Sequence, residues 1–327
     1  DIFHPMMLAH PLVLEKDLST ANPKDFIAEY KWDGIRIQIV SYSEGCRLYS
    51  RTGDDITNSF PEISKAIKGN FVLDGELLAG IDNEPKTFND LQQRLNKKSP
   101  TEKFIKTNPS FVKVYDVLFF NGIDLRDNPL NERKKILNSY FNKNRSPLFL
   151  SETIKFRNWE ELNKMRDISD NQIHEGVMIK LTSSPYISGR PRGKWFKWKR
   201  NPKLVDAIIM YAQRGHGKRS SFYSDYTFGV FNKDQELVPI GKAYSGFTDE
   251  ELNRLDKFVR TKTTNRFGPV REVEKTLVVE IAFDDISFSK RHKSGIALRF
   301  PRFKRIRWDK PVNEVETLEQ ITKSYLE

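Results

Sequence analysis

Cysteine is nearly absent from this chain, and long apolar runs are absent altogether. The 327 residues include one cysteine, Cys46, so no disulfide can form within the chain, and a lone thiol fits a reducing compartment. A membrane-spanning helix needs about 18 uninterrupted apolar residues, a length that no stretch of the sequence reaches. No signal-peptide pattern, repeat or low-complexity tract is found either. These absences exclude a disulfide-stapled secreted domain and predict a cytoplasmic globular protein without a membrane partner.

Negative charge is also scarce relative to positive charge. The chain has 55 Lys and Arg against 44 Asp and Glu, a net charge of +11, which favours a polyanionic partner. Residues 186–203 contain no acid and residues 290–310 contain one, Asp309. Both segments interleave cations with aromatic residues, as in Trp195-Phe196-Lys197-Trp198-Lys199. This alternation predicts strands that present lysines to phosphates from one face.

Hydrophobic periodicity predicts a mixed α and β domain over residues 1–200. Strands are expected at 26–30, 35–42, 71–79, 112–120, 176–181 and 194–199, and helices at 61–67, 89–96 and 129–141. The last helix is expected to have Asn128 as its N-cap and Pro129 at its first position. The polar segment 200–203, with Pro202, predicts a linker between two domains.

The second predicted domain, residues 201–327, is mostly β. Strands are expected at 204–212, 226–231, 237–243, 276–283 and 298–304, and a helix at 249–261 behind a capping box of Thr248 and Glu251. Five strands and one helix fit a small Greek-key barrel of the oligonucleotide-binding (OB) type. The predicted fold class of the whole chain is therefore α+β.

Five strings place charged residues beside predicted strands. They are Lys31-x-Asp33-Gly34-x-Arg36, Ser50-Arg51-Thr52-Gly53, Asp74-Gly75-Glu76, Glu175-Gly176-Val177-Met178-Ile179-Lys180 and Lys197-x-Lys199. An acid and a guanidinium close to a lysine can position and activate it as a nucleophile. Carboxylates inside an apolar strand are costly unless a ligand, metal or cation pairs with them. Taken singly, a solvated Lys31 on an edge strand and ordinary core packing of Tyr115 and Met178 remain the alternatives.

Together, in this order and spacing, the strings resemble the motifs of the covalent nucleotidyltransferases, which comprise ATP-dependent DNA ligases, RNA ligases and GTP-dependent mRNA capping enzymes. Residues 298–310 resemble the last motif of the ATP-dependent DNA ligases. Residues 88–94 and 291–295 are similar to the bacterial members of that branch. The resemblance covers nearly the whole chain.

The resemblance implies an adenylation domain of antiparallel sheets with flanking helices, followed by an OB-fold barrel. It implies an enzyme that uses ATP and Mg²⁺ to seal 5′-phosphate/3′-hydroxyl nicks in double-stranded DNA through a lysyl-adenylate and a DNA-adenylate. A monomer is expected, associated with the nucleoid if the source is prokaryotic. Larger members carry a helical domain ahead of the adenylation domain, so either a catalytic core of a longer protein or a compact ligase is expected.

The resemblance also implies a role for each motif residue. Lys31 is the nucleophile, with Asp33, Lys197 and Lys199 as further catalytic residues, and Glu175 and Glu76 are the metal carboxylates. Glu29 accepts from the adenine amino group. The residues implied to hold other parts of the nucleotide are Arg36, Arg51, Glu76, Tyr115, Met178, Lys180, Trp195, Arg305, Arg307 and Lys310.

Two other functions remain open at the level of sequence. RNA joining or GTP-dependent capping would use the same lysine, and only the preferred nucleotide or the nucleic acid would distinguish them. A non-catalytic OB-fold protein would bind nucleic acid in a salt-sensitive way and form no covalent adenylate.

Overall fold

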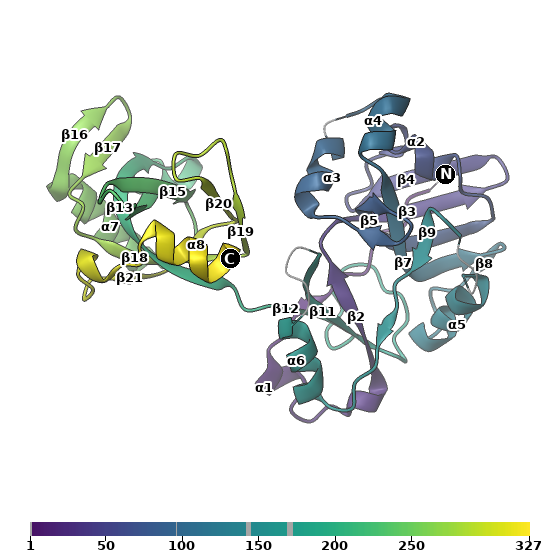
Figure 1. The fold of residues 1–327 in the computed structure, drawn as a ribbon. Coiled ribbons are helices and arrows are strands. Elements are labelled where there is room, and N and C mark those ends of the chain that lie inside the picture. Colours follow the sequence, from purple (N-terminus) through teal and green to yellow (C-terminus); the bar gives the residue numbers. More distant parts are fainter. Residues whose placement is uncertain (1, 96, 142–144, 169–172) are drawn as a thin grey trace. The chain divides into compact units, whose positions relative to one another are not determined.

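The computed structural model describes residues 2–95, 97–141, 145–168 and 173–327 (Figure 1). The chain forms two compact units, Asp1–Arg200 and Asn201–Glu327. Each unit combines antiparallel sheets with helices, and the predicted α+β class is confirmed. Among the described residues, none of the helices has both the length and the apolar character needed to cross a membrane.

The first unit contains two sheets. One has the order β1-β12-β11-β2-β10, and all its pairs are antiparallel except β1 with β12. Its strands are β1 (His10–Pro11), β12 (Trp195–Lys199), β11 (His174–Leu181), β2 (Phe26–Trp32) and β10 (Thr153–Ile154). The residues that alternate along β12 divide as predicted, because Phe196 and Trp198 pack in an apolar core with Val177 while Lys199 is exposed.

The other sheet has the order β4-β3-β5-β7-β8, with β6 beside β5 and β9 parallel to β7. Its strands are β4 (Gly45–Ser50), β3 (Ile35–Tyr42), β5 (Phe71–Ile81), β7 (Ser110–Phe120), β8 (Ile123–Asp124), β6 (Glu84–Pro85) and β9 (Leu148–Leu150). The central strand β5 is buried at nine of its first ten residues, which explains its nearly continuous apolar sequence.

Helices cover this second sheet. Ile63, Leu91 and Leu137, from α2, α3 and α5, are fully or almost fully buried in one core with Leu73 and Val114 of the sheet. The helices of the unit are α1 (Leu14–Asp17), α2 (Pro61–Ser64), α3 (Phe88–Leu95), α4 (Glu102–Thr107), α5 (Leu130–Tyr140) and α6 (Trp159–Ile168), with short 3-10 turns at Pro23–Asp25 and Thr57–Ser59.

The second unit is a strongly curved sheet. β13 (Lys203–Arg214), β14 (Tyr223–Phe231) and β15 (Leu237–Ala243) form a meander, and β18 (Val278–Phe283) lies between β13 and β21 (Arg302–Arg307). The sheet closes because the amide of Phe303 donates to the carbonyl of Ser245 at 3.0 Å, just past β15. The other elements are α7 (Asp249–Lys262), the hairpins β16 (Thr263–Phe267) with β17 (Val270–Val273) and β19 (Asp285–Phe288) with β20 (Ile296–Arg299), α8 (Leu318–Leu326), and 3-10 turns at Gly217–Arg219 and Val312–Glu314. This closed meander, with one helix after its third strand, agrees with the predicted OB barrel.

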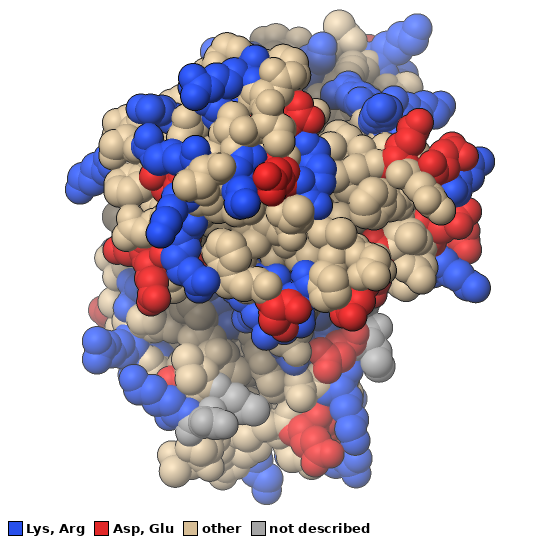
Figure 2. Space-filling model, turned by 90° about the vertical axis from the view of Figure 1, so that its left-hand side faces the viewer, with Lys and Arg blue, Asp and Glu red and all other residues tan. Residues whose placement is uncertain are grey.

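Basic side chains lie over the outside of the second unit (Figure 2). On β21 Lys304 and Arg305 are exposed, whereas Phe303 before them is buried. The alternation predicted for the second basic segment holds only at Phe303, because Phe300 and Trp308 are 61% and 41% exposed.

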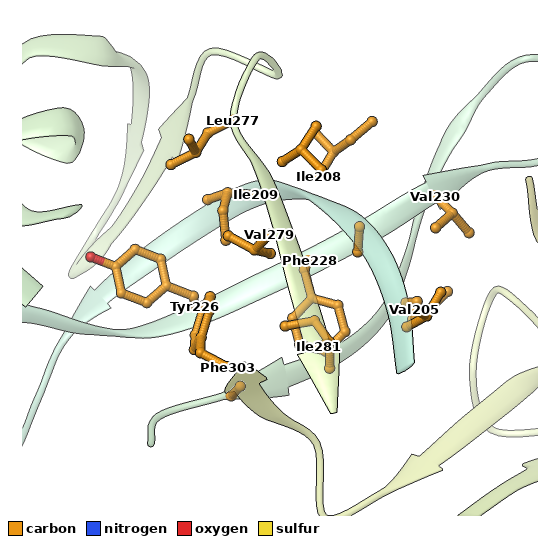
Figure 3. Close-up of a cluster of buried hydrophobic side chains, with 14 of the residues drawn as sticks. Val205, Ile208, Ile209, Tyr226, Phe228, Val230, Leu277, Val279, Ile281 and Phe303 are labelled. Atoms are coloured by element: carbon orange, nitrogen blue, oxygen red, sulfur yellow. The ribbon is translucent and has the colours of Figure 1, made fainter. Parts of the chain in front are cut away.

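The interior of the barrel is filled by apolar side chains from several strands (Figure 3). Phe228 and Ile281 are fully buried there, and Phe303 and Tyr226 meet edge to face with ring centroids 5.6 Å apart. The capping box at Thr248 and Glu251 is present, so the predicted start of α7 is confirmed.

Two expectations about local structure were wrong, and one hairpin was missed. Pro129 is the N-cap of α5 rather than its first residue, because its backbone is extended (ψ 151°) and its carbonyl accepts from Glu132 and Arg133. The strand expected at 298–304 is divided into β20 and β21, because Phe300 has a positive φ of 48° and Pro301 has no amide hydrogen to donate. The hairpin β16–β17, whose first strand is largely exposed, was not predicted. Residue 96, the expected end of a helix, lies outside the described residues.

A buried ion pair ties α5 to β7. The Arg133 guanidinium donates to both carboxylate oxygens of Asp116, at 2.8 and 3.0 Å, and to the carbonyls of Asn128 and Ser184. Both charged side chains are 0% exposed. Removing one partner of such a pair leaves the other charge buried and uncompensated.

We expect Arg133→Met to lower the free energy of unfolding by about 3–5 kcal/mol, measured by urea denaturation. The matched control is Arg126→Met, which breaks the exposed pair with Asp124 and is expected to cost less than about 1 kcal/mol. Equal effects of the two substitutions would contradict this account of the buried pair.

Candidate active site

A cavity of about 390 Å³ lies in the first unit, and both of its sheets contribute to the lining. β2, β11 and β12 supply residues from one sheet, and β3, β5 and β7 supply residues from the other. The sequence-predicted residues that line it are Glu29, Lys31, Arg36, Arg51, Glu76, Tyr115, Glu175, Met178, Lys180, Trp195 and Lys197. The lining thus brings together residues that are far apart in the sequence: Glu29 and Lys197, for example, are separated by 168 positions.

Strand register explains how the sheet of β2 presents its residues. Lys197 of β12 lies opposite Met178 of β11, and Met178 lies opposite Glu29 of β2. Residues opposite one another across a sheet share a face, so these three side chains form one row. Lys31, two residues after Glu29, follows on the same face because strand side chains alternate.

Lys31 contacts a carboxylate from the neighbouring strand. Its Nζ donates to Oε2 of Glu175 at 2.5 Å, and the two side chains are 23% and 26% exposed. Two glycines allow this geometry. A Cβ on Gly176 would lie 2.2 Å from the carbonyl oxygen of Trp198, and a Cβ on Gly34 would lie 2.2 Å from that of Leu77. The turn after Lys31 and the bulge after Glu175 can therefore approach their neighbours only as glycine.

The predicted catalytic residues Asp33 and Lys199 do not line the cavity, but both lower the pKa of Glu175. Burial opposes ionisation of Glu175, yet its pKa is lowered by the charge of Lys31 and the hydrogen bond from it, then by Lys199 and by a hydrogen bond with Asp33. The carboxylate at this end of the cavity is thus held ionised among cations.

Several cations converge at the same end. Burial is the largest cause of the lowered pKa of Lys197, followed by the charges of Lys199, Lys31, Arg190 and Arg51. Groups that lower one another's pKa in this way favour an anion between them. A chain of phosphates has the charge that would satisfy this region.

Arg36 is held in place from behind the cavity. Its Nε and Nη2 donate to the two oxygens of Asp74, at 3.0 and 2.6 Å, and the Tyr186 hydroxyl donates to Asp74 at 2.7 Å. The guanidinium carbon lies 5.9 Å from the ring centroids of both Tyr115 and Trp195. Arg36 therefore presents a fixed charge beside the two aromatic rings.

The opposite end of the cavity contains a buried carboxylate. Glu29, 1% exposed, accepts from Lys134 of α5 through Oε1 and from Lys180 through Oε2 at 3.4 Å. The Lys180 ammonium also lies 4.4 Å from the ring centroids of Tyr115 and Trp195. Aromatic faces and one carboxylate form a surface suited to a planar base that carries a hydrogen-bond donor.

Lys134 was not identified from the sequence. A signal was present, because Leu130, Lys134 and Leu137 follow the i, i+4, i+7 spacing of a buried helix face and all three are buried. A lysine on such a face needs an acid within reach. Nothing in the spacing indicates that this acid is Glu29, 105 residues away.

Glu76 has an unusual protonation state for a carboxyl group. Burial is the main cause that raises its pKa to about 8, and the charges of Glu175 and Asp74 raise it further, against the opposing effect of Lys31 and Arg36. At neutral pH the group is therefore mostly protonated.

The carboxylates fit a magnesium ion only in part. The described residues contain no group of three or more His, Cys, Asp or Glu that could hold a metal. Mg²⁺ in nucleotide sites binds one or two carboxylates, and phosphates and water complete its shell. Glu175, with Asp33 hydrogen-bonded to it and Glu76 close enough to feel its charge, suits an ion that arrives together with phosphates.

The predicted nucleotide-binding residues Arg305, Arg307 and Lys310 belong to the second unit. There Lys310 pairs with Asp206 at 2.5 Å, Arg305 with Glu280 at 3.2 Å, and Arg307 with Asp309 at 3.2 Å.

Comparison with known proteins agrees with the motifs. The family model described as ATP dependent DNA ligase domain matches residues 6–199, and that described as ATP dependent DNA ligase C terminal region matches residues 219–310. A probable DNA ligase of Koribacter versatilis is 38% identical over 99% of this chain, and a DNA ligase of Archaeoglobus fulgidus is 34% identical over 91%. The chain spans 61% and 54% of the lengths of these two relatives.

The fold also matches a solved structure of a DNA ligase. A mycobacterial DNA ligase D complexed with ATP and MES matches 96% of this chain and 98% of its own, with a TM-score of 0.52 and 20% identity. The fold of an adenylation domain followed by an OB barrel is thereby confirmed. Since the first family model covers more than half of the chain, this protein belongs to the family of ATP-dependent DNA ligases.

Proposed function

We propose that the chain is the catalytic core of an ATP-dependent DNA ligase that seals 5′-phosphate/3′-hydroxyl nicks in duplex DNA. Residues 1–200 are its adenylation domain and residues 201–327 its OB domain. The observation that carries the proposal is the cavity that brings Lys31, Glu175 and Lys197 to one end and Glu29 and aromatic side chains to the other. Family membership favours DNA joining over RNA joining, capping or non-catalytic binding.

In the first step Lys31 attacks the α-phosphorus of ATP. The amine attacks after its ammonium has released a proton to solvent; the N–P bond forms, and the bond to the pyrophosphate oxygen breaks. Lys197 and Lys199 stabilise the charge that develops on the α-phosphate. Glu175, with Asp33 and Glu76 close to it, would hold Mg²⁺, which would polarise the phosphate oxygens.

The other lining residues orient the nucleotide. Tyr115 and Met178 contact the two faces of the adenine ring, and Lys180 and Trp195 complete its pocket. Glu29 accepts a hydrogen bond from the 6-amino group. Arg36 and Arg51 hold the ribose, and later the phosphate of the nick. The DNA ligase D that shares this fold was solved with ATP, which supports ATP as the substrate.

Nicked DNA receives the AMP in the remaining steps. AMP passes from Lys31 to the 5′-phosphate, and the 3′-hydroxyl then displaces it to join the strands. The basic outer surface of the OB domain holds the phosphate backbone without reading bases. The cytoplasmic location and the monomeric state remain predictions.

We expect Lys31→Ala to abolish the covalent adenylate and all ATP-dependent sealing, because no other nucleophile replaces the amine. Sealing of a nick that already carries a 5′-adenylate should persist, since that step does not pass through Lys31. The readouts are mass spectrometry of the protein and a gel assay on the two DNA substrates. The exposed Lys24→Ala is the control, and an adenylate on the Lys31→Ala protein would refute the assignment.

Lys310 tests the role of the last motif. If Arg305, Arg307 and Lys310 orient the pyrophosphate as leaving group, Lys310→Ala should slow self-adenylation about 10-fold or more, and sealing of pre-adenylated nicks should be nearly unchanged. The exposed Lys304→Ala, on β21 six residues before Lys310, is the control. A Lys310→Ala protein that labels itself at the wild-type rate argues against the role.

Glu76 gives a pH-dependent prediction. Its pKa is about 8 in the folded protein against 4.5 for the free group, so the folded state binds more protons between these values. The stability that this proton provides is complete below about pH 4.5 and is lost as the pH rises through about 8.

In metal- and nucleotide-free protein, we therefore expect wild type to lose about 1–3 kcal/mol relative to Glu76→Gln between about pH 5 and pH 9, measured by urea denaturation. The exposed Glu84→Gln controls for the substitution itself. If wild type instead became more stable relative to Glu76→Gln as the pH rises, the pKa of Glu76 would not be raised in the folded protein.

A further inference from the structure

The carboxylate proposed to read the base is held from two sides. Lys134 reaches Oε1 of Glu29 from α5, and Lys180 reaches Oε2 from β11 at 3.4 Å. The side chains of the three residues are 9% exposed or less. An ammonium at each oxygen favours the ionised carboxylate and restricts its rotation.

The two lysines do not hold Glu29 equally. The Lys180 ammonium also lies over the rings of Tyr115 and Trp195. Its contact with Glu29 is long, at 3.4 Å. Lys134 makes the closer contact. It does not line the nucleotide cavity; it lines a neighbouring one of about 450 Å³ together with Asn131, Ser151 and Glu152. Its hydrogen bond reaches the nucleotide cavity through Glu29, and its charge adds to burial in lowering the pKa of Lys180.

The surrounding buried charges are already paired with one another. Arg36 pairs with Asp74 and Arg133 pairs with Asp116, each through two hydrogen bonds. These pairs leave Lys134 and Lys180 as the cations that Glu29 contacts among the described residues. Loss of Lys134 would thus leave Oε1 of a buried carboxylate without its ammonium.

We propose that Lys134 is a positioning residue that sets the purine specificity of the site: it holds Glu29 as an ionised acceptor, so that a 6-amino purine is bound and a 6-oxo purine is rejected. The inference rests on the proposed function, because it concerns the nucleotide that Lys31 attacks. An ionised carboxylate has acceptors and no donor, so it cannot pair with a 6-oxo group. The carboxylate oxygen and the 6-oxo oxygen would then be two buried acceptors without a donor, and such a mismatch discriminates strongly between similar ligands.

Without Lys134 the carboxylate can rotate away or take up a proton. A protonated Glu29 has one O–H donor, which can bind the 6-oxo oxygen. The preference for 6-amino purines should then fall while the chemistry at Lys31 continues.

The test compares lysyl-nucleotide formation from ATP and from inosine triphosphate, whose base carries a 6-oxo group. Wild type is expected to prefer ATP. In Lys134→Gln the ratio of kcat/KM for the two nucleotides should fall about 10-fold or more, mainly through a higher KM for ATP. This ratio would not move if Lys134 only stabilised the fold, because both nucleotides would then be affected alike.

Two control variants accompany the test. Lys135→Gln changes the exposed neighbour on the same helix and should keep the wild-type ratio. Lys134→Arg retains a cation and should restore most of the preference. An unchanged ratio in Lys134→Gln overturns the proposal, and so does a fall in kcat with the ratio intact. If wild type forms no lysyl-nucleotide from either compound, it is the proposed function that fails.

A further variant covers the case in which Lys134→Gln does not fold. Glu29→Gln/Lys134→Gln removes both charges of the closer pair, so neither Glu29 nor Lys134 is left buried and charged without the other. It should have lost the preference to the same extent as Glu29→Gln alone, because Lys134 acts through Glu29. A double variant that retains the wild-type ratio would overturn the proposal.

Discussion

The pairing of buried charges is the constraint on which the first unit depends. Asp74, Asp116 and Glu29 are almost inaccessible to solvent, and an ionised carboxylate in such a place is tolerated only with a cation and hydrogen bonds. Arg36, Arg133 and Lys134 supply these. Two of these pairs attach α5 to a strand of each sheet, and the third joins β3 to β5.

This pairing gives the two ends of the cavity different chemistry. At the base end the charged groups contact one another, with both Lys134 and Lys180 on Glu29, so recognition relies on the direction of a hydrogen bond and on aromatic faces. At the end of Lys31 and Lys197, cations gather around the ionised carboxylate of Glu175, and burial together with these charges lowers the pKa of Lys197. An excess of cations attracts phosphate, and only there does a charge develop that they can stabilise during the reaction.

The sequence predicts those parts of the fold that depend on local patterns. β3 and β15 have the expected bounds, and the capping box starts α7, because alternation and capping are set by neighbouring residues. The motifs predicted which residues would gather around Lys31. The partner of Glu29 could not be predicted, because it depends on how α5 packs against β2 across 105 residues. The protonation of Glu76 likewise depends on burial and on four charges, three of which come from other strands.

Selection of the base and activation of the phosphate can therefore change independently. Lys134 lies on a helix that supplies none of the residues lining the nucleotide cavity. A substitution there alters which atom of the purine is accepted and leaves the contact between Lys31 and Glu175 in place. The glycines constrain the other end, because Gly34 and Gly176 leave no space for a Cβ beside the residues that hold the amine. The reacting end is thus fixed by backbone packing, whereas the specificity of the base end rests on a single side chain behind the carboxylate that reads it.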